Sequence, residues 1–221
     1  MNVLGFDTTT DACSAAVWCG DGLAAHRFET LRRGHVERLV PMVTDAMAEA
    51  GLDFDALDLI AVTTGPGTFT GIRIGLAAAR GFGLAASVPV AGMTSLEVLA
   101  AAQRSGDQDR GIIAAIDARR GQIYRQVFDV AMVPLEAPCV VAQDAALPWS
   151  GRWLAVGSGA FVYAGMADVE VREDSRLPDA SVLVELAYRR FGVPGATMPT
   201  HYPAPLYLRA PDADLPETSD G

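Results

Sequence analysis

A glycine-rich segment between an apolar run and a helical pattern is the stretch of this chain best suited to chemistry. Residues Thr64–Gly75 contain four glycines and follow the apolar run 59–62. A strand, a turn and a helix in that order can present free backbone N–H groups to an anion at the helix N-terminus. The spacing is neither that of a P-loop nor that of a dinucleotide-binding fingerprint. The alternative is a tight turn at residues 65–67 with a purely structural role.

Side chains that usually carry metal or covalent chemistry are few and scattered. Cys13, Cys19 and Cys139 lack metal or redox spacing, so we expect buried, reduced thiols. The three histidines are far apart, and the absence of lysine excludes Schiff-base and P-loop lysine chemistry. The net charge is −10 and there is no basic cluster. Such a chain is a poor nucleic-acid binder on its own, so its expected partners are proteins or small molecules.

The elements that must position these groups follow an α/β order. In the first half we expect strands over 3–7, 12–19, 23–29, 58–63 and 89–93, and helices over 35–50, 71–87 and 94–104. Thr94 and Glu97 form a capping-box pattern at the start of the last helix. In the second half we expect a hairpin over 111–117 and 122–130, a strand over 153–157, and helices over 159–166 and 182–191. This order predicts an internal duplication.

The polar residues after position 104 mark a boundary between two lobes. We expect an N-terminal lobe over 1–104, a smaller C-terminal lobe over 105–210, and a disordered acidic tail over 211–221. Neither a leader peptide nor a membrane span is recognisable, because proline and glycine interrupt the long uncharged stretches. The expected location is the cytoplasm.

Several segments together resemble one known family. They are Phe6–Thr10, Gly34–His35 with Leu39–Met42, the Gly65–Gly75 block, Ile116–Tyr124 and Pro205–Arg209. These segments are similar to those of the bacterial TsaB (YeaZ) proteins. The resemblance implies an actin-like ATPase-superfamily (ribonuclease H-like) fold with two duplicated α/β lobes. It also implies a part in making threonylcarbamoyladenosine in tRNA, together with a paralogous transferase, TsaD, and a small ATPase, TsaE. The tRNA would be met only through that complex.

The superfamily resemblance also implies a place for a nucleotide. Asp7, Thr8 and Thr9 stand where the superfamily contacts the metal and phosphates, and Gly157 and Gly159 resemble its adenosine motif. The usual glycine after the aspartate is missing, and so is a lysine for the phosphates. We therefore expect weak or partner-dependent binding of ATP or ADP with Mg²⁺, at or near the partner interface. Otherwise Asp7 caps a turn and residues 157–159 form a strand-to-helix bend.

The same resemblance argues against a catalytic centre. The paralogous transferase carries a His-x-x-x-His metal pair, and the matching positions here are Ser95 and Leu99. Leucine cannot ligate a metal, so no metal site is expected, and Glu97 is interpreted as a helix cap. His35 has no second histidine beside it and is expected at the surface or in an interface.

Two helices are expected to form the partner surface. Gly71, Gly75, Ala79 and Gly83 recur every fourth residue and would form a smooth helical stripe. Arg73 lies among these glycines and would project to a partner or an anion. The preceding helix would add larger side chains, namely Val36, Leu39, Val40, Val43 and Met47. In the resembling family this surface pairs with the paralogue, and a homodimer can use the same face.

The sequence therefore predicts a non-catalytic partner and activator of a TsaD-type tRNA threonylcarbamoyl transferase. A different class of function is a stand-alone ATPase or kinase of the actin superfamily that uses Asp7, Thr9 and the 157–159 turn. A metallopeptidase is a third alternative, against which the absent histidine pair argues.

Overall fold

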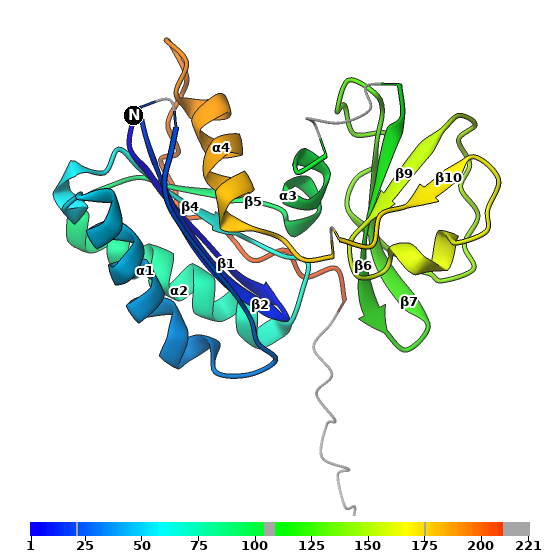
Figure 1. Ribbon diagram of the computed structural model, residues 1–221, viewed down its shortest axis with the longest axis horizontal. Helices are drawn as coiled ribbons and strands as arrows, with labels where there is room; N and C mark the ends of the chain where they lie inside the picture. The colour runs from blue at the N-terminus through cyan, green and yellow to red at the C-terminus, as the bar shows by residue number, and fades with distance from the viewer. Residues whose placement is uncertain (21, 104–108, 175, 210–221) are drawn as a thin grey trace, which may run out of the picture.

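Five strands near the N-terminus form a mixed sheet with helices on both faces (Figure 1). The computed structural model describes residues 1–20, 22–103, 109–174 and 176–209. The sheet has the order β3-β2-β1-β4-β5. Its strands are β1 (Val3–Thr10), β2 (Ala12–Cys19), β3 (Gly22–Thr30), β4 (Leu59–Thr63) and β5 (Val90–Met93). Strand β1 is antiparallel to β2 and parallel to β4, and both β1 and β4 are buried throughout, as central strands covered on both faces should be.

A second five-stranded sheet repeats this topology. Its order, β8-β7-β6-β9-β10 when read from the hairpin edge, matches that of the first sheet strand for strand. The strands are β6 (Gly111–Arg119), β7 (Gln122–Phe128), β8 (Cys139–Ala142), β9 (Trp153–Val156) and β10 (Val169–Val171). The pairing directions are also repeated, with β6 antiparallel to β7 and parallel to β9. The chain therefore has the duplicated, actin-like fold that was expected.

The helices do not repeat as fully as the strands. In the first lobe, α1 (His35–Ala50) and α2 (Phe69–Ala86) cover one face of the sheet, and α4 (Ala180–Phe191) covers the other (Figure 1). A short helix, η1 (Phe54–Ala56), follows α1. Residues 143–152 of the second lobe contain no counterpart of α1. The counterpart of α2 is only the single turn η2 (Ala160–Tyr163).

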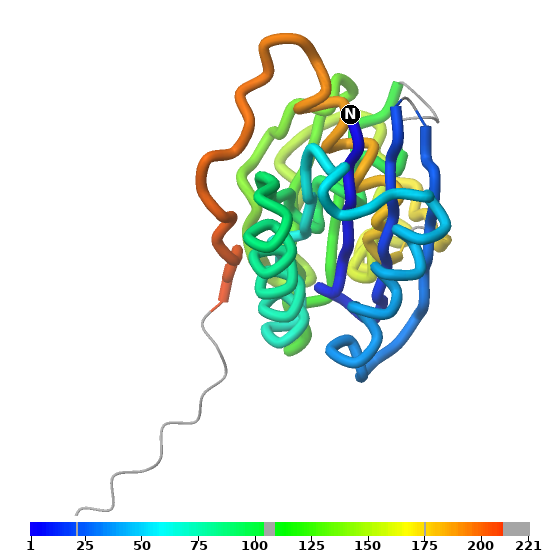
Figure 2. Tube along the Cα trace, turned by 90° about the vertical axis from the view of Figure 1, so that its left-hand side faces the viewer, coloured from blue at the N-terminus to red at the C-terminus, as the bar shows by residue number. Residues whose placement is uncertain are grey.

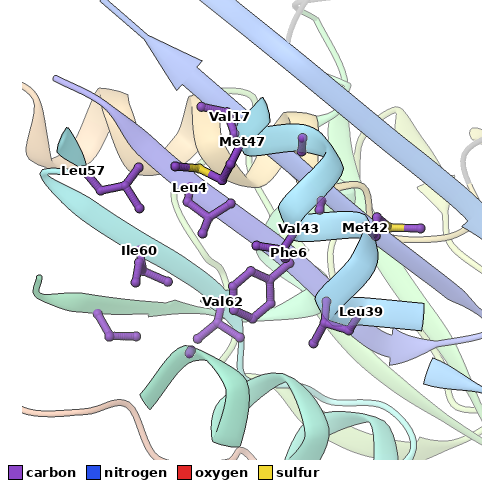
Figure 3. Close-up of a cluster of buried hydrophobic side chains, with 14 of the residues drawn as sticks. Leu4, Phe6, Val17, Leu39, Met42, Val43, Met47, Leu57, Ile60 and Val62 are labelled. Carbon is purple, nitrogen blue, oxygen red and sulfur yellow. The ribbon is translucent and has the colours of Figure 1, made fainter. Parts of the chain in front are cut away.

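The core beneath α1 holds the first lobe together. Figure 3 shows Phe6 of β1 between Val43 of α1 and Val62 of β4, with Leu4 of β1 in the same cluster. The phenyl ring of Phe6 makes an edge-on contact with that of Phe82 at 6.1 Å between centroids. Helix α1 ends at Gly51, whose φ of 65° is the left-handed conformation typical of a helix C-terminus. Burial of these apolar side chains is the main force that fixes α1 and α2 on the sheet.

Each lobe is also packed by the final helix of the other. Helix α3 (Ser95–Ala101) follows the first sheet, yet its Leu96 and Leu99 pack in one apolar cluster with Ile112 and Ile116 of β6. Helix α4 follows the second sheet, yet it packs on β1, β2 and β4 of the first. The exchange ties the two lobes together across the cleft between them.

The segment after α4 returns along the first lobe. Figure 2 shows residues 192–209, in orange and red, running beside α2. The amide of Leu206 donates to the carbonyl of Thr64 at 2.8 Å, and Arg80 of α2 donates to the carbonyl of Pro203 at 3.3 Å. The rings of Tyr207 and Phe69 lie 5.0 Å apart. This segment, which we call the C-terminal strap (192–209), therefore ends at the mouth of the interlobe cleft.

Most predicted elements are confirmed within a few residues, and two helices are wrong in length. The helix expected over 94–104 ends at Ala101, and the one expected over 159–166 is only the turn η2. The lobe boundary after residue 104 and the tail 211–221 lie outside the described residues. No helix in the described ranges is long and apolar enough to cross a membrane.

Candidate functional site

Asp7, the carboxylate predicted beside a nucleotide, lies inside the first lobe. Its side chain is fully buried. Its Oδ1 accepts hydrogen bonds from the backbone amide of Thr9 at 3.2 Å, from the Thr9 hydroxyl at 2.6 Å and from the Thr63 hydroxyl. The Thr9 hydroxyl is in turn 2.9 Å from that of Ser95 on α3. Asp7 therefore anchors a network of hydroxyl groups that joins β1, β4 and α3.

Burial also controls the protonation of Asp7. Desolvation raises the pKa of its carboxyl from 3.8 to about 6, and the hydrogen bonds from Thr63 and Thr9 and the nearby His35 offset only part of that rise. The second oxygen, Oδ2, is buried and has no hydrogen-bond partner among the described residues. The expected role of Asp7 at a nucleotide-bound Mg²⁺ does not fit this enclosed carboxyl.

The two glycines predicted to contact adenosine are required by the chain's own packing. A Cβ on Gly157 would lie 2.1 Å from the carbonyl oxygen of Ala115 on β6, and the residue has a φ of 98°. A Cβ on Gly159 would lie 2.9 Å from the carbonyl carbon of Ile116. The close approach that excludes a side chain here is that of β6, so these glycines form the strand-to-helix bend that was the alternative interpretation.

The small-residue stripe of α2 faces inward, which corrects the expectation of a partner surface there. Gly71, Gly75, Ala79 and Gly83 are all buried. A Cβ on Gly71 would lie 2.0 Å from the carbonyl oxygen of Thr8, and the Thr8 hydroxyl donates to the Gly71 carbonyl at 2.7 Å. The stripe lets α2 approach the end of β1 closely. A bulky residue in it would disturb the fold before it could disturb a partner.

The surface residues expected on α1 divide into two groups. Leu39, Val43 and Met47 are buried in the core of the first lobe, because the helix must cover its own sheet. Val36 and Val40 are 62% and 51% exposed. Only these two of the five nominated side chains are open to a partner.

A different face of α2, which the sequence analysis missed, is open to solvent. Ala77, Gly81, Leu84 and Ala85 are exposed there, and a Cβ on Gly81 would meet nothing within 4 Å. Leu84 is 76% exposed, which is unusual for so large an apolar side chain. Ala77, Gly81 and Ala85 recur every fourth residue, as the residues of the buried stripe do. The spacing could be seen in the sequence, but the sequence did not show which of the two stripes faces solvent.

Arg73 lies beside this open face, at the N-terminal part of α2. Its guanidinium stacks 3.6 Å above the ring of Phe69, and its Nε donates to the Tyr207 hydroxyl at 3.1 Å. Arg73 therefore holds the C-terminal strap to α2.

A cleft of about 430 Å³ separates the lobes. Of the five predicted nucleotide residues, Thr9 lines it, and Asp7, Thr8, Gly157 and Gly159 are not among its lining residues. The first lobe contributes the end of β1 and the start of α2, and the second contributes the β6–β7 hairpin and Ser158. The strap closes one side. The polar side chains that line the cleft are Thr9, Thr10, Asp11, Thr68, Asp117, Arg119, Tyr124, Ser158, Arg176, Tyr207 and Arg209.

Known proteins with the same features identify the family. The family model of TsaD, tRNA N6-adenosine threonylcarbamoyltransferase, matches residues 29–148. The tRNA threonylcarbamoyladenosine biosynthesis protein TsaB of Escherichia coli K12 is 32% identical over 95% of both chains. Its Haemophilus influenzae counterpart is 29% identical over 95% of this chain and 94% of that one. This chain belongs to the TsaB family.

Solved structures agree with that assignment. YeaZ from Pseudomonas aeruginosa is 30% identical, with a TM-score of 0.80 over 94% of this chain and 99% of that one. A P. aeruginosa protein described as similar to peptidase YeaZ gives a TM-score of 0.83 with the same identity and coverage. The match covers both lobes, so the fold of this TsaB-family chain is that of its relatives.

In this TsaB-family chain, the α3 positions that match the transferase's histidine pair serve packing. Ser95 is fully buried and bonded to Thr9, and Leu99 lies in the apolar cluster beneath β6. The capping box is confirmed, because Thr94 accepts from the amide of Glu97 at 3.0 Å and Glu97 accepts from the amide of Thr94 at 2.8 Å. The Glu97 carboxylate also accepts a hydrogen bond from the guanidinium of Arg190 on α4 at 3.0 Å.

His35 was expected at the surface or in an interface, and the structure buries it within the first lobe. Its Nε2 lies 3.0 Å and 3.1 Å from the carbonyl oxygens of Thr10 and Ala12. His35 thereby fixes the start of α1 to the β1–β2 turn, so its role is structural. Within the described residues, no group of three His, Cys, Asp or Glu side chains is placed to hold a metal ion.

The three cysteines are free, as expected, and differ in burial. Cys13 is buried in the core, and Cys19 and Cys139 are partly buried. Desolvation raises the pKa of the Cys13 thiol to about 12. Since the thiolate is the reactive form, Cys13 is an inert core residue.

Proposed function

We propose that this chain is a non-catalytic partner that binds and activates a TsaD-type transferase in the threonylcarbamoyladenosine modification of tRNA. Its family membership supports the pathway, because its relatives are named for threonylcarbamoyladenosine biosynthesis. The match to the TsaD family model supports a paralogous relationship with the transferase itself. In this proposal the chain acts in the cytoplasm, a TsaE-type ATPase completes the machine, and tRNA is met through the complex.

The observation that carries the proposal is the open apolar face of α1 and α2. Val36 and Val40 project from α1, and Ala77, Gly81 and Leu84 project from α2. Arg80 is the only charged residue between positions 74 and 86, in a chain with 44 charged residues (17 basic and 27 acidic). Exposed apolar patches on two adjacent helices are typical of protein interfaces, and small residues allow a partner helix to approach closely. We name this surface, formed by Val36, Val40, Ala77, Gly81 and Leu84, the outer helix face.

The direct test is binding of the cognate TsaD-type paralogue, followed by threonylcarbamoyl transfer to tRNA in the reconstituted system. Val40→Glu and Gly81→Glu each place a charge on the outer helix face without crowding the core, because both positions are exposed. An unpaired charge in an interface costs several kcal/mol, so each variant should weaken pairing by about 30-fold or more. Transfer activity at limiting concentration should fall in parallel.

Val133→Glu is the matched control, because Val133 is 54% exposed on the second lobe. It should pair and activate like the unsubstituted chain. The proposal fails if the transferase reaches full activity without this chain, or if both outer-face variants pair normally. Saturable ATP turnover by the isolated chain would instead favour a stand-alone ATPase.

A further inference from the structure

We propose that a cavity in the second lobe docks a segment of a protein partner that carries a bulky apolar side chain next to a lysine or arginine. The cavity has a volume of about 470 Å³. It lies where β6 and β9 begin and β7 ends, which is the end of the second sheet opposite the interlobe cleft. Figure 1 shows the second lobe on the other side of the molecule from α1 and α2. The inference therefore concerns a second surface and does not depend on the proposed partner function.

The walls of the cavity are mainly apolar. Val130 and Leu135, in the connection between β7 and β8, are 60% and 38% exposed. Pro148 and Trp149 come from the connection before β9, and Trp153 is the first residue of that strand. Exposed apolar side chains around a hollow are typical of protein interfaces, in which a large side chain of the partner fills the hollow. The volume of the cavity suits one such side chain together with its neighbouring peptide groups.

Internal contacts hold these walls in place. The guanidinium of Arg125 lies 5.8 Å from the centre of the Trp149 ring. Arg125 is only 5% exposed and donates two hydrogen bonds to the Glu136 carboxylate, at 2.8 and 3.1 Å. The amide of Leu135 donates to the carbonyl of Val127 at 2.8 Å, which fixes Leu135 beside the end of β7. Because the cavity is formed before binding, little conformational entropy is lost when a segment docks.

The indole of Trp153 adds an unused hydrogen-bond donor to the cavity. Trp153 is 7% exposed, and its Nε1 has no hydrogen-bond partner among the described residues. Gly111 makes room for the ring, because a Cβ there would lie 2.2 Å from the Cζ3 atom of Trp153. A Cβ on Gly151 would lie 4.0 Å from Nε1, and both glycines line the cavity. A buried N–H without an acceptor is costly, so a carbonyl group that enters beside Gly151 gains a hydrogen bond.

The charges of the cavity favour a cation. Its lining contains the carboxylates of Asp109 and Asp129 and the guanidinium of Arg152, so the net charge is −1. Arg152 donates to Asp109 at 2.9 Å, and these two charges offset each other. Oδ1 of Asp129 accepts the backbone amides of Ala131 and Val133, at 2.9 and 2.8 Å, and Oδ2 has no partner among the described residues. Oδ2 is therefore the acceptor for an ammonium or guanidinium group.

A peptide segment supplies all three complementary groups at once. Its apolar side chain fills the hollow between Val130 and Trp149, a backbone carbonyl meets the N–H of Trp153, and a basic side chain meets Asp129. A free amine lacks the carbonyl. An acidic segment would be repelled by Asp129.

The experiment is a titration of the isolated full-length chain, isotope-labelled for NMR, with the blocked dipeptide acetyl-Phe-Lys-amide. The readout is the indole N–H signals of the three tryptophans. Trp149 and Trp153 line the cavity, whereas Trp18 donates its indole N–H to the carbonyl of Gly20 at 3.1 Å in the first lobe and is the internal reference. We expect saturable shifts of the Trp149 and Trp153 signals at millimolar peptide, and none of the Trp18 signal. No shift of the two cavity signals up to about 10 mM peptide would overturn the proposal.

Three related probes separate the anchor, the charge and the carbonyl group. Acetyl-Gly-Lys-amide lacks the apolar anchor, acetyl-Phe-Glu-amide reverses the charge, and phenethylamine has a ring and an ammonium but no carbonyl. Each should bind at least about 5-fold more weakly than acetyl-Phe-Lys-amide. Equal binding of acetyl-Phe-Glu-amide would contradict the preference for a cation. Equal binding of phenethylamine would show a site for small amines instead of a peptide.

Matched variants test where the peptide binds. Val130→Arg places a cation in the lining, whereas Val133→Arg changes the same turn outside the cavity at a similar exposure of 54%. Asp129→Asn keeps an acceptor for the turn amides and removes the charge, and Asp144→Asn is its control at an exposed position outside the cavity. The two cavity variants should weaken binding by at least about 10-fold and 3-fold, and the controls should bind normally. Equal binding within either pair would overturn the proposal.

A second copy of the chain is the alternative occupant. Sedimentation of the unsubstituted chain and of Val130→Arg distinguishes the two. We expect the same oligomeric state for both, whereas a dimer that Val130→Arg dissociates would overturn the proposal of a different protein partner. Since no transferase is present, none of these outcomes bears on the partner function.

Discussion

Asp7 and Asp117 occupy equivalent places in the two repeats, and the structure treats them in opposite ways. Each lies near the end of the first strand of its sheet, just before the register with the next strand shifts. Each accepts the backbone amide two residues ahead, that of Thr9 at 3.2 Å and that of Arg119 at 2.8 Å. Asp7 is fully buried, whereas Asp117 is exposed and lines the cleft.

The helices explain the difference. In the first lobe, α2 lies directly on the end of β1 and Ser95 of α3 reaches the same network, so the carboxyl is sealed. In the second lobe only the turn η2 stands in the place of α2, and the hairpin end stays open. Both lobes therefore contain the same contact between an aspartate carboxylate and the backbone amide two residues ahead. Because only the first lobe has helices over this contact, Asp7 is buried and anchors the fold, whereas Asp117 stays exposed beside Arg119.

The largest expected effect comes from forcing α2 away from β1. Gly71→Ala places a Cβ 2.0 Å from the carbonyl oxygen of Thr8, so the helix must shift and open the seal over Asp7. We expect a loss of about 4 kcal/mol in the free energy of unfolding, measured by urea titration. Gly81→Ala on the same helix meets open space and should stabilise the chain by about 0.5–1 kcal/mol. Equal effects of the two substitutions would show that α2 does not seal the end of β1.

Removing each carboxyl in turn tests the comparison itself. At pH 5, below the pKa of about 6, Asp7→Ala leaves the buried hydroxyls of Thr9 and Thr63 without their acceptor and creates a cavity. The expected loss is about 3 kcal/mol. Asp117→Ala loses one exposed turn contact and should cost less than about 1 kcal/mol. Urea unfolding of both variants measures the two losses in the free energy of unfolding. Similar losses would refute the distinction between Asp7, which anchors the fold, and Asp117, which does not.

The protonation of Asp7 predicts a pH dependence of stability. Its pKa is raised to about 6 in the folded chain, so the contribution of this group is fully present below about 4 and is lost as the pH rises through 6. Asp7→Asn keeps an acceptor for the two threonines and cannot ionise. Above pH 7 it should be more stable than the unsubstituted chain by up to about 3 kcal/mol, and the advantage should vanish near pH 4. Thermal unfolding across this range measures it, and parallel pH profiles would contradict it.

The sequence was sufficient where the signal is local. The hairpins, the capping box of Thr94 and Glu97, and the end of α1 at Gly51 all depend on residues close together in the chain, and all are confirmed. The sequence was insufficient for α2, because that helix is apolar or small on nearly every side. Two stripes with the same spacing, one starting at Gly71 and one at Ala77, could face the interior. The contacts of Gly71 with Thr8 and of Gly83 with Val90, which are distant in the sequence, show that the first one does.

The candidate site needed contacts between distant residues. The burial of Asp7 depends on Thr63 and Ser95, which lie 56 and 88 residues further along the chain. No local sequence pattern predicts that burial. The arginines of the cleft, Arg119, Arg176 and Arg209, come from three segments that are far apart in the sequence. The sequence analysis found no basic cluster, because these arginines are not neighbours in the sequence and only the fold brings them to one cleft.

The smallest expected change in stability tests whether Arg119, at the second hairpin, is dispensable for the fold. Arg119 has a φ of 63°, in the left-handed region that asparagine tolerates better than arginine. Arg119→Asn should therefore change the free energy of unfolding by no more than about 0.5 kcal/mol, and in the stabilising direction. Urea titration measures this change, and a large loss of stability would make Arg119 a structural residue like Asp7.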